Sequence, residues 1–123
     1  MSSGYHETGL SEKTTEIHRA LASLQEELEA VDWYNQRMDT SGDQALADIL
    51  KHNRDEEIEH ACMALEYLRR EVPEFDENLK TYLFTSVPVT EVEEQEAEGG
   101  GEEGGNSNSA SSSTGDLGIG SGK

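Results

Sequence analysis

Apolar residues recur at intervals of three and four between residues 11 and 38. The recurring positions are Ile17, Ala20, Leu21, Leu24, Leu28, Val31 and Tyr34, with neither Gly nor Pro among them. This spacing predicts a long amphipathic helix. Ser11 is a suitable N-cap for it, and the segment Asp39-Thr-Ser-Gly42 is expected to end it.

A second apolar run begins near Asp43 and predicts another long helix. Its members are Leu46, Ile49, Leu50, Ile58, Ala61, Leu65 and Leu68. Arg69 and Arg70 fall in its last turn, where cations favour a helix end, and Pro73 stops it. A connection of about four or five residues predicts that the two helices are antiparallel neighbours. A shorter third helix is expected from Pro73 or Glu74, with Phe75, Leu79, Tyr82 and Leu83 on one side.

The composition changes after Thr85. Residues 86–123 hold eight of the 27 acidic residues and only one lysine, with runs of Gly, Ser and Asn between them. Such a segment buries too little apolar surface to offset the entropy of ordering, so it is expected to be disordered. The expected organisation is a flexible N-terminus (1–10), a helical domain (11–85), an acidic Gly/Ser-rich linker (86–116) and a terminal peptide (117–123).

Each long helix carries apolar residues on more than one face. On the second helix, Leu46, Leu50 and Ala64 follow one line, and Ile58, Ala61, Leu65 and Leu68 follow another. A hairpin covers only one of these lines, so the other predicts self-association. The expected fold is therefore all-α: an antiparallel two-helix hairpin with a short third helix, dimerising into a four-helix bundle.

The formal net charge is −18, which argues against a nucleic-acid partner because a polyanion would be repelled. Cys62 is the only cysteine, so no intrachain disulfide can form. Neither a signal peptide nor a run of 18 apolar residues is found, so a soluble cytoplasmic protein is expected, with no membrane partner.

The stretch RDEEIEHA (54–61) crowds carboxylates and an imidazole onto a helix, although like charges at helical spacing oppose helix formation. Glu57 and His60 are spaced i, i+3 and share an apolar line of the second helix. Glu27 lies on an apolar line of the first helix. A bound cation would offset the cost of placing these charges there. Glu56 also reaches His60 at i, i+4, so spacing alone does not choose between Glu56 and Glu57.

Di-iron and di-manganese carboxylate bundles use one Glu from each of two helices and a Glu-x-x-His from each of the other two. This chain carries half of that set, and a second copy related by a two-fold axis would complete it. Carboxylates with one imidazole per metal and no thiolate favour iron or manganese. The competing interpretation is that E-x-x-H arises by chance on a solvated helix face.

Several neighbouring residues allow two interpretations. Glu26, Glu29 and Asp32 could attract cations toward the centre or simply keep the surface soluble. Trp33 and Tyr34 could shield a metal centre, although aromatic residues at this spacing are more often core. His6, His18 and His52 show no defensible partner spacing.

The segments EELEAVDWYNQR (26–37), HNRDEEIEHACMALEYLRR (52–70) and LKTYLFT (79–85) resemble the encapsulated ferritins. This resemblance covers most of residues 11–88. It implies a ferritin-like di-iron site built across a dimer, a ring-shaped decamer, and ferroxidase activity on Fe(II) with dioxygen. It also implies that Glu27, Glu57 and His60 are the metal ligands, that Glu26 and Glu29 are outer metal-attracting carboxylates, and that Trp33 and Tyr34 lie near the centre.

The terminal peptide Leu117-Gly118-Ile119-Gly120-Ser121 is similar to the targeting peptides that dock cargo inside encapsulin shells. Gly122 stands where a further Leu is common, which predicts weaker docking. The resemblance thus implies a ferroxidase inside an encapsulin iron-storage nanocompartment. The alternative is a non-catalytic acidic helical module that binds metal or acts as a scaffold.

Overall fold

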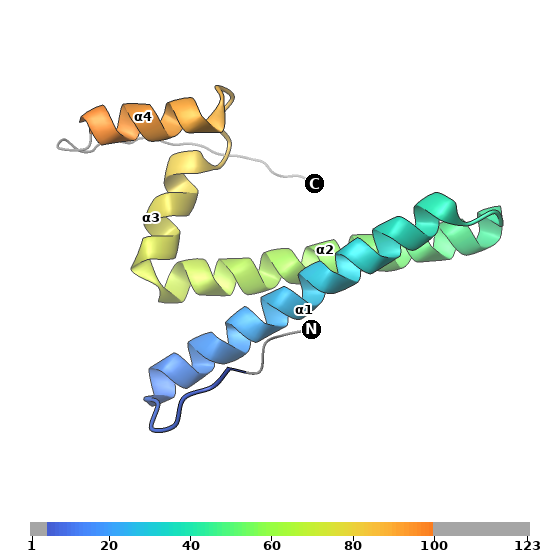
Figure 1. Cartoon of the computed structure of the whole chain (residues 1–123), viewed down its shortest axis with the longest axis horizontal. Coiled ribbons are helices and arrows are strands. Elements are labelled where there is room, and N and C mark those ends of the chain that lie inside the picture. The colour runs from blue at the N-terminus through green and yellow to red at the C-terminus, as the bar shows by residue number, and fades with distance from the viewer. Residues whose placement is uncertain (1–4, 100–123) are drawn as a thin grey trace. The chain divides into compact units, whose positions relative to one another are not determined.

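The computed structural model describes residues 5–99, and the regular secondary structure in that range is helical throughout. Four helices follow one another along the chain: α1 (Glu12–Thr40), α2 (Gln44–Glu71), α3 (Pro73–Tyr82) and α4 (Val89–Gly99) (Figure 1). The chain divides into two compact units, residues 1–77 and 78–123, with the division inside α3. The prediction of an all-α fold with a long antiparallel hairpin and a short third helix is confirmed.

Both long helices begin at the predicted caps. The side chain of Ser11 accepts a hydrogen bond from the Thr14 backbone N–H at 3.1 Å, at the start of α1. Asp43 does the same for α2, since its Oδ1 accepts from the Ala45 backbone N–H at 2.9 Å. Each cap satisfies a backbone donor that has no partner within its helix.

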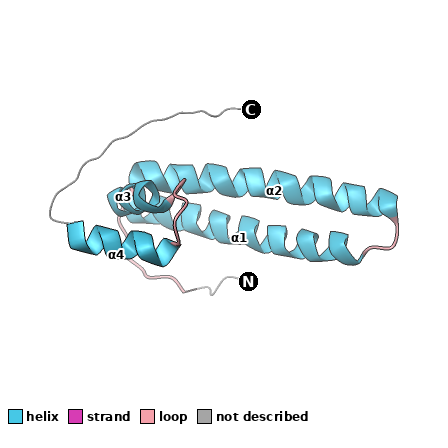
Figure 2. Ribbon diagram, turned by 90° about the horizontal axis from the view of Figure 1, so that it is seen from above, coloured by secondary structure: helices cyan, strands magenta, loops and turns pink. Residues whose placement is uncertain are grey.

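The connection between α1 and α2 is only residues 41–43, and the two helices run antiparallel side by side (Figures 1 and 2). Ala61 and Leu68 are buried on α2, and seven residues separate them, which places them on one line of the helix. Arg54 Nη1 donates a hydrogen bond to Asn35 Oδ1 across the hairpin at 2.8 Å. This bond ties one position of α1 to one position of α2.

Large apolar side chains stay exposed along the hairpin. They are Leu21, Leu28 and Trp33 on α1, and Leu46, Ile49, Ile58, Met63 and Tyr67 on α2. The single chain therefore covers only part of its apolar surface, in agreement with the pattern of more than one apolar face per helix. Such exposed apolar patches are typical of surfaces that bind another molecule.

An ion-pair network holds the corner where α2 gives way to α3. Arg69 donates to both Glu66 oxygens at 2.8 and 2.9 Å and also to Asp76, while Arg70 donates to Glu66 at 2.7 Å. Hydrogen bonds from Arg69 and Arg70 lower the pKa of Glu66 to about 2. The pKa of Arg69 is raised in turn by Glu66 and Asp76. The first turn of α3 is thereby attached to the end of α2.

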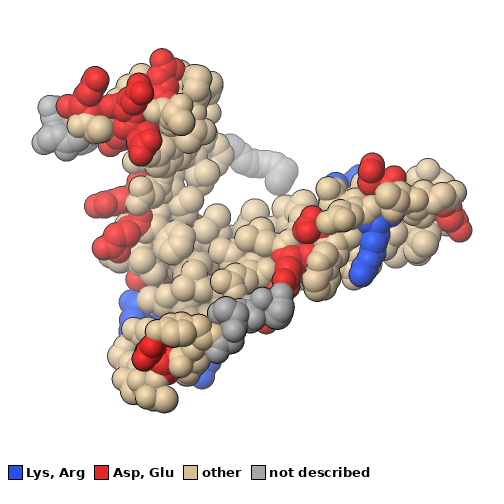
Figure 3. Space-filling model, in the orientation of Figure 1, with Lys and Arg blue, Asp and Glu red and all other residues tan. Residues whose placement is uncertain are grey.

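The prediction that order ends at Thr85 is wrong for residues 89–99, which form α4. The Pro88 carbonyl accepts hydrogen bonds from the Glu91 and Val92 backbone N–H groups at 2.9 and 3.1 Å, and Val92 is buried. Its sequence VTEVEEQEAEG holds several good helix formers, and Gly appears only at its end. On the face shown in Figure 3, acidic atoms cover much of α4.

Between α3 and α4 the backbone passes through a left-handed conformation at Phe84, where φ is +64°. The Phe84 side chain is fully exposed. None of the helices within residues 5–99 offers an apolar stretch of the length that a membrane span requires.

Candidate metal centre

Two of the predicted ligands come from one turn of α2. Glu57 lies one turn before the buried Ala61, so its side chain points toward the seam between the helices and is 26% exposed. His60 lies three residues after Glu57, further toward the open side of the hairpin, and is 47% exposed. The i, i+3 spacing brings the two side chains together.

The third predicted ligand, Glu27, comes from the middle of α1. Its Oε1 lies 3.5 Å from His60 Nδ1, and Glu57 Oε1 lies at the same distance from that nitrogen. One donor atom from each of the three residues lies within 4.8 Å of the other two. The antiparallel hairpin thus brings Glu27 to Glu57 and His60, which follow it by about thirty residues in the sequence.

Glu27 Oε1 is buried and accepts no hydrogen bond. A buried acceptor without a partner costs about 1–3 kcal/mol, so such an atom calls for an explanation. The adjoining Glu57 carboxyl group is the main cause that raises the pKa of Glu27; burial adds to it, and His60 opposes it. A cation at this place would satisfy the oxygen and offset the repulsion between the carboxylates.

The donor set fits iron or manganese. Two carboxylates and one imidazole, without a thiolate, are the ligands of carboxylate-rich redox sites rather than of soft-metal sites. Within residues 5–99 one chain brings three donor residues together, and His60 is left half-exposed at the edge of the hairpin. The group is therefore able to bind a cation but leaves part of its coordination open.

The structure separates the two glutamates that spacing alone could not. Glu57 contacts His60, whereas Glu56 Oε2 lies 3.4 Å from Nε2 of His52, on the preceding turn. The earlier interpretation that His52 has no partner spacing is therefore wrong, since His52 and Glu56 are spaced i, i+4. Sequence analysis likewise missed a contact between His6 and His18, whose ring centroids are 5.0 Å apart.

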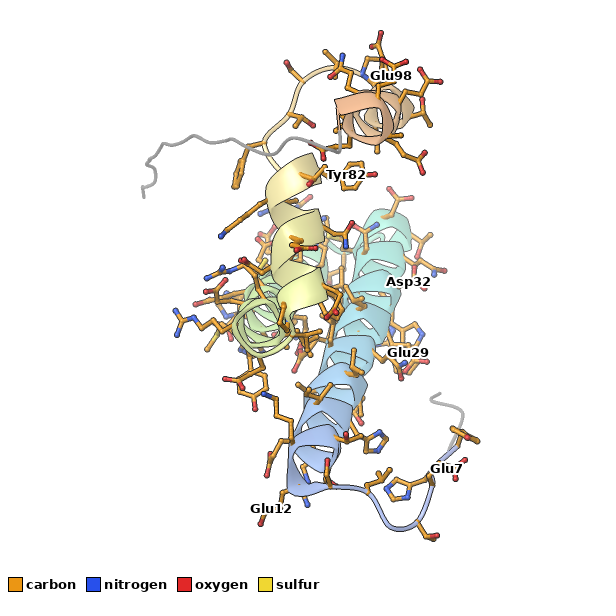
Figure 4. All side chains as sticks on the ribbon, turned by 90° about the vertical axis from the view of Figure 1, so that its left-hand side faces the viewer. Glu7, Glu12, Glu29, Asp32, Tyr82 and Glu98 are labelled. Carbon is orange, nitrogen blue, oxygen red and sulfur yellow. The ribbon has the colours of Figure 1, made fainter. Side chains whose placement is uncertain are left out.

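The outer residues named from the sequence are not brought into the three-residue group. Glu26 is exposed and Glu29 is half-buried, and neither belongs to the group. Figure 4 shows Glu29 and Asp32 on the side of α1 away from α2.

The two aromatic residues on α1 lie in different settings. Trp33 is half exposed. Tyr34 is half-buried, and the Arg37 guanidinium lies 5.5 Å from its ring centroid. Seven residues separate Tyr34 from Glu27, so the two share a face of α1. The predicted targeting peptide, Leu117 to Ser121, lies outside the described residues.

A helical hairpin that gathers Glu, Glu and His into one group is typical of the ferritin-like carboxylate proteins. The EncFtn-like family model matches residues 4–86, and the chain belongs to this family.

Two relatives match along nearly the whole chain. A "Ferritin-like protein" of Thermotoga maritima is 52% identical over 121 residues, covering 97% of both chains. An "Encapsulated ferritin-like protein" of Rhodospirillum rubrum is 53% identical over 113 residues, covering 91% of this chain and 81% of the relative. Among solved structures, protein ne0167 from Nitrosomonas europaea is 56% identical and superimposes with a TM-score of 0.68, covering 71% of this chain and 98% of that one.

Proposed function

We propose that this protein is a ferroxidase, which oxidises Fe(II) to Fe(III) with dioxygen at a di-iron centre formed between two copies of the chain. The observation that carries the proposal is the convergence of Glu27, Glu57 and His60, with a buried Glu27 oxygen that lacks a hydrogen bond. Membership of the EncFtn-like family supports it.

The position of His60 on the surface of α2 supports the role of a second copy. Leu46, Ile49, Met63 and Tyr67 lie on the same side of α2 as His60, and all four are exposed in the single chain. An apolar surface with half of a ligand set at its centre fits a two-fold contact, in which both copies use the same surface patch. Two copies supply four carboxylates and two imidazoles, the ligand set of a two-metal carboxylate bundle.

The ligands act by favouring the higher oxidation state. Four carboxylates stabilise a ferric ion more than a ferrous ion because the ligand oxygens are hard and negatively charged. Each Fe(II) gives up one electron, and dioxygen accepts the electrons. The pKa of Glu27 is raised beside Glu57, so protons compete with metal for this carboxylate and metal binding weakens as the pH falls.

Oxygen uptake after addition of Fe(II) tests the proposal. The parent protein is expected to consume oxygen and form a ferric product, whereas Glu57→Ala and His60→Ala lose most of the rate. Glu56→Ala is the matched control, because it removes a carboxylate from the same turn that faces His52 instead. If the Glu57 and His60 variants consume oxygen as fast as the parent, the ligand assignment is wrong.

The rival function is a helical module that binds divalent ions at its acidic surface without redox chemistry. The net charge of −18 favours it, since such a field attracts cations at any exposed carboxylate. It predicts no ferric product and an assembly that does not respond to iron. Native mass spectrometry with and without Fe(II) separates the two, because the ferroxidase proposal places the iron between subunits, in assemblies up to a ring-shaped decamer.

The name of the Rhodospirillum rubrum relative describes an encapsulated protein. We extend this to the present chain and propose that it is cargo of an encapsulin shell in the cytoplasm, docked through Leu117 to Ser121. Deletion of residues 117–123 is expected to abolish co-purification with the shell protein and to leave Fe(II) oxidation in solution intact. Encapsulation that persists after the deletion would reject this role.

A further inference from the structure

Two histidines, a residue type that often binds metal ions, lie together at the start of the hairpin, away from the centre at Glu27. The N-terminal segment reverses at Gly9, where φ is +75°, and runs back beside the first turns of α1 (Figures 1 and 4). The reversal brings the His6 ring against the His18 ring, with the centroids 5.0 Å apart and the ring planes inclined by 75°. His18 precedes Glu27 by nine residues, which is about 13 Å along the helix axis.

The spacing of the two rings suits a shared ion. A zinc-type ion binds an imidazole nitrogen at about 2.0–2.1 Å, so each ring centroid would lie roughly 3 Å from it and the two centroids roughly 5 Å apart at a tetrahedral angle. The observed separation agrees with that value.

Local charge does not oppose a cation here. The two basic side chains nearest His18 in the sequence are both paired with acids, Lys13 with Glu71 at 3.2 Å and Arg19 with Glu16 at 2.9 Å. Glu7 follows His6, but its carboxylate accepts a hydrogen bond from the Tyr5 hydroxyl. The donors that the structure brings into contact at this place are the two imidazoles, and water would complete the coordination of an ion.

We propose that His6 and His18 together bind a late first-row divalent ion, such as Zn²⁺ or Cu²⁺. Imidazole ligands favour these ions over Mg²⁺ and Ca²⁺, which prefer oxygen donors. The ion would attach residues 5–10 to α1. This site is separate from the Glu27 centre and does not depend on the proposed ferroxidase function.

Histidine modification by diethyl pyrocarbonate, located by peptide mass spectrometry, tests the proposal on the full chain. Zn²⁺ at ten times its dissociation constant is expected to slow modification of His6 and His18 roughly tenfold, since only the free site reacts. Ca²⁺ at the same concentration should not protect either residue. The same protection is expected in Glu57→Ala, in which the iron centre lacks a ligand.

The decisive result is the mutual dependence of the two residues. In His18→Gln, His6 should lose its protection by Zn²⁺, and in His6→Gln, His18 should lose it. His6 lies outside every helix, so its replacement leaves the hairpin intact. His52, which is exposed on α2 and contacts Glu56, should react at an unchanged rate in both variants. Protection of one residue without the other, or of neither, would show a packing contact only and overturn the proposal.

Discussion

Glu56 and Glu57 are adjacent in sequence, yet their carboxylates contact different histidines: Glu56 reaches His52, and Glu57 reaches His60. Successive residues on an α-helix point about 100° apart, so one faces the flank of α2 and the other faces the seam with α1. Only Glu57 also approaches a carboxylate from the other helix, that of Glu27.

Because Glu57 and not Glu56 faces Glu27, metal should stabilise the fold only when Glu57 is present. Fe(II) under anaerobic conditions should raise the melting temperature of the parent and of Glu56→Gln, but not that of Glu57→Gln. An ion present at 100 times its dissociation constant adds about 2.7 kcal/mol to the free energy of unfolding. Differential scanning fluorimetry measures the shift. If Glu56→Gln and Glu57→Gln both lose this rise in melting temperature to the same extent, the ion does not distinguish the two carboxylates.

Replacement of Glu27 should stabilise the metal-free protein. The pKa of Glu27 is raised in the folded state, so the folded state binds more protons and its stability falls as pH rises above the ordinary value of 4.5. Glu27→Gln removes this loss of stability at neutral pH. The expected gain in the free energy of unfolding is about 0.5 kcal/mol, the size of the effect of relieving a like-charge pair.

Thermal melts of metal-free protein at pH 7 measure the effect of Glu27→Gln. Glu26→Gln is the control, since Glu26 is exposed and lies outside the metal group. A lower melting temperature for Glu27→Gln than for the parent would contradict the prediction.

Acid should weaken the corner between α2 and α3. The pKa of Glu66 in the folded state is about 2, below its ordinary value of 4.5. The ionised Glu66 therefore contributes fully to the free energy of unfolding above about pH 4.5, and this contribution is lost as the pH falls toward 2. Glu66→Gln should therefore lower the melting temperature at pH 7 and flatten its decline between pH 4.5 and 2. Glu59→Gln, an exposed change on the same helix, should follow the parent curve.

Removal of the cross-hairpin hydrogen bond should cost stability. Asn35→Ala deletes the acceptor of Arg54 Nη1 and leaves a half-buried guanidinium group with one partner fewer, at an expected cost of about 1 kcal/mol. Gln36→Ala is a matched control, because Gln36 makes an exposed bond within α1 to Asp32. Urea unfolding at neutral pH compares the two variants. A larger loss for Gln36→Ala would argue against the importance of the inter-helix bond.

Two leucine truncations should behave differently. Leu68 is 0% exposed, so Leu68→Ala should lower the free energy of unfolding by about 2–5 kcal/mol. Leu28 is 54% exposed in the single chain, so Leu28→Ala should affect a monomer little. If Leu28→Ala instead shifts the oligomers seen by light scattering toward smaller species, its side chain lies in a contact between copies.

The helices of the hairpin could be predicted from the sequence because their signals are local. Ser11 and Asp43 mark the two starts, and Pro73 marks the beginning of α3. Helix α4 was missed because its composition was averaged with the glycine-rich residues that follow it. Within α4 itself, Gly occurs only at the last position, and the Pro88 carbonyl accepts the first hydrogen bonds.

The candidate site was predictable in part. The i, i+3 spacing indicated Glu57 and His60, and the apolar face of the first helix indicated Glu27. The choice between Glu56 and Glu57 needed the direction of each side chain relative to α1, which depends on how the hairpin closes. The approach of His6 to His18 has no periodic signal, since it depends on a chain reversal at Gly9.

The short turn at residues 41–43 limits how this hairpin can change in length. A single residue inserted between Glu27 and the turn would rotate Glu27 by about 100° and move it about 1.5 Å along the axis, away from its partners on α2. Seven residues added to each helix on the turn side of the site would nearly restore the facing directions. Natural or designed elongation of this hairpin is therefore expected in paired steps of two helical turns.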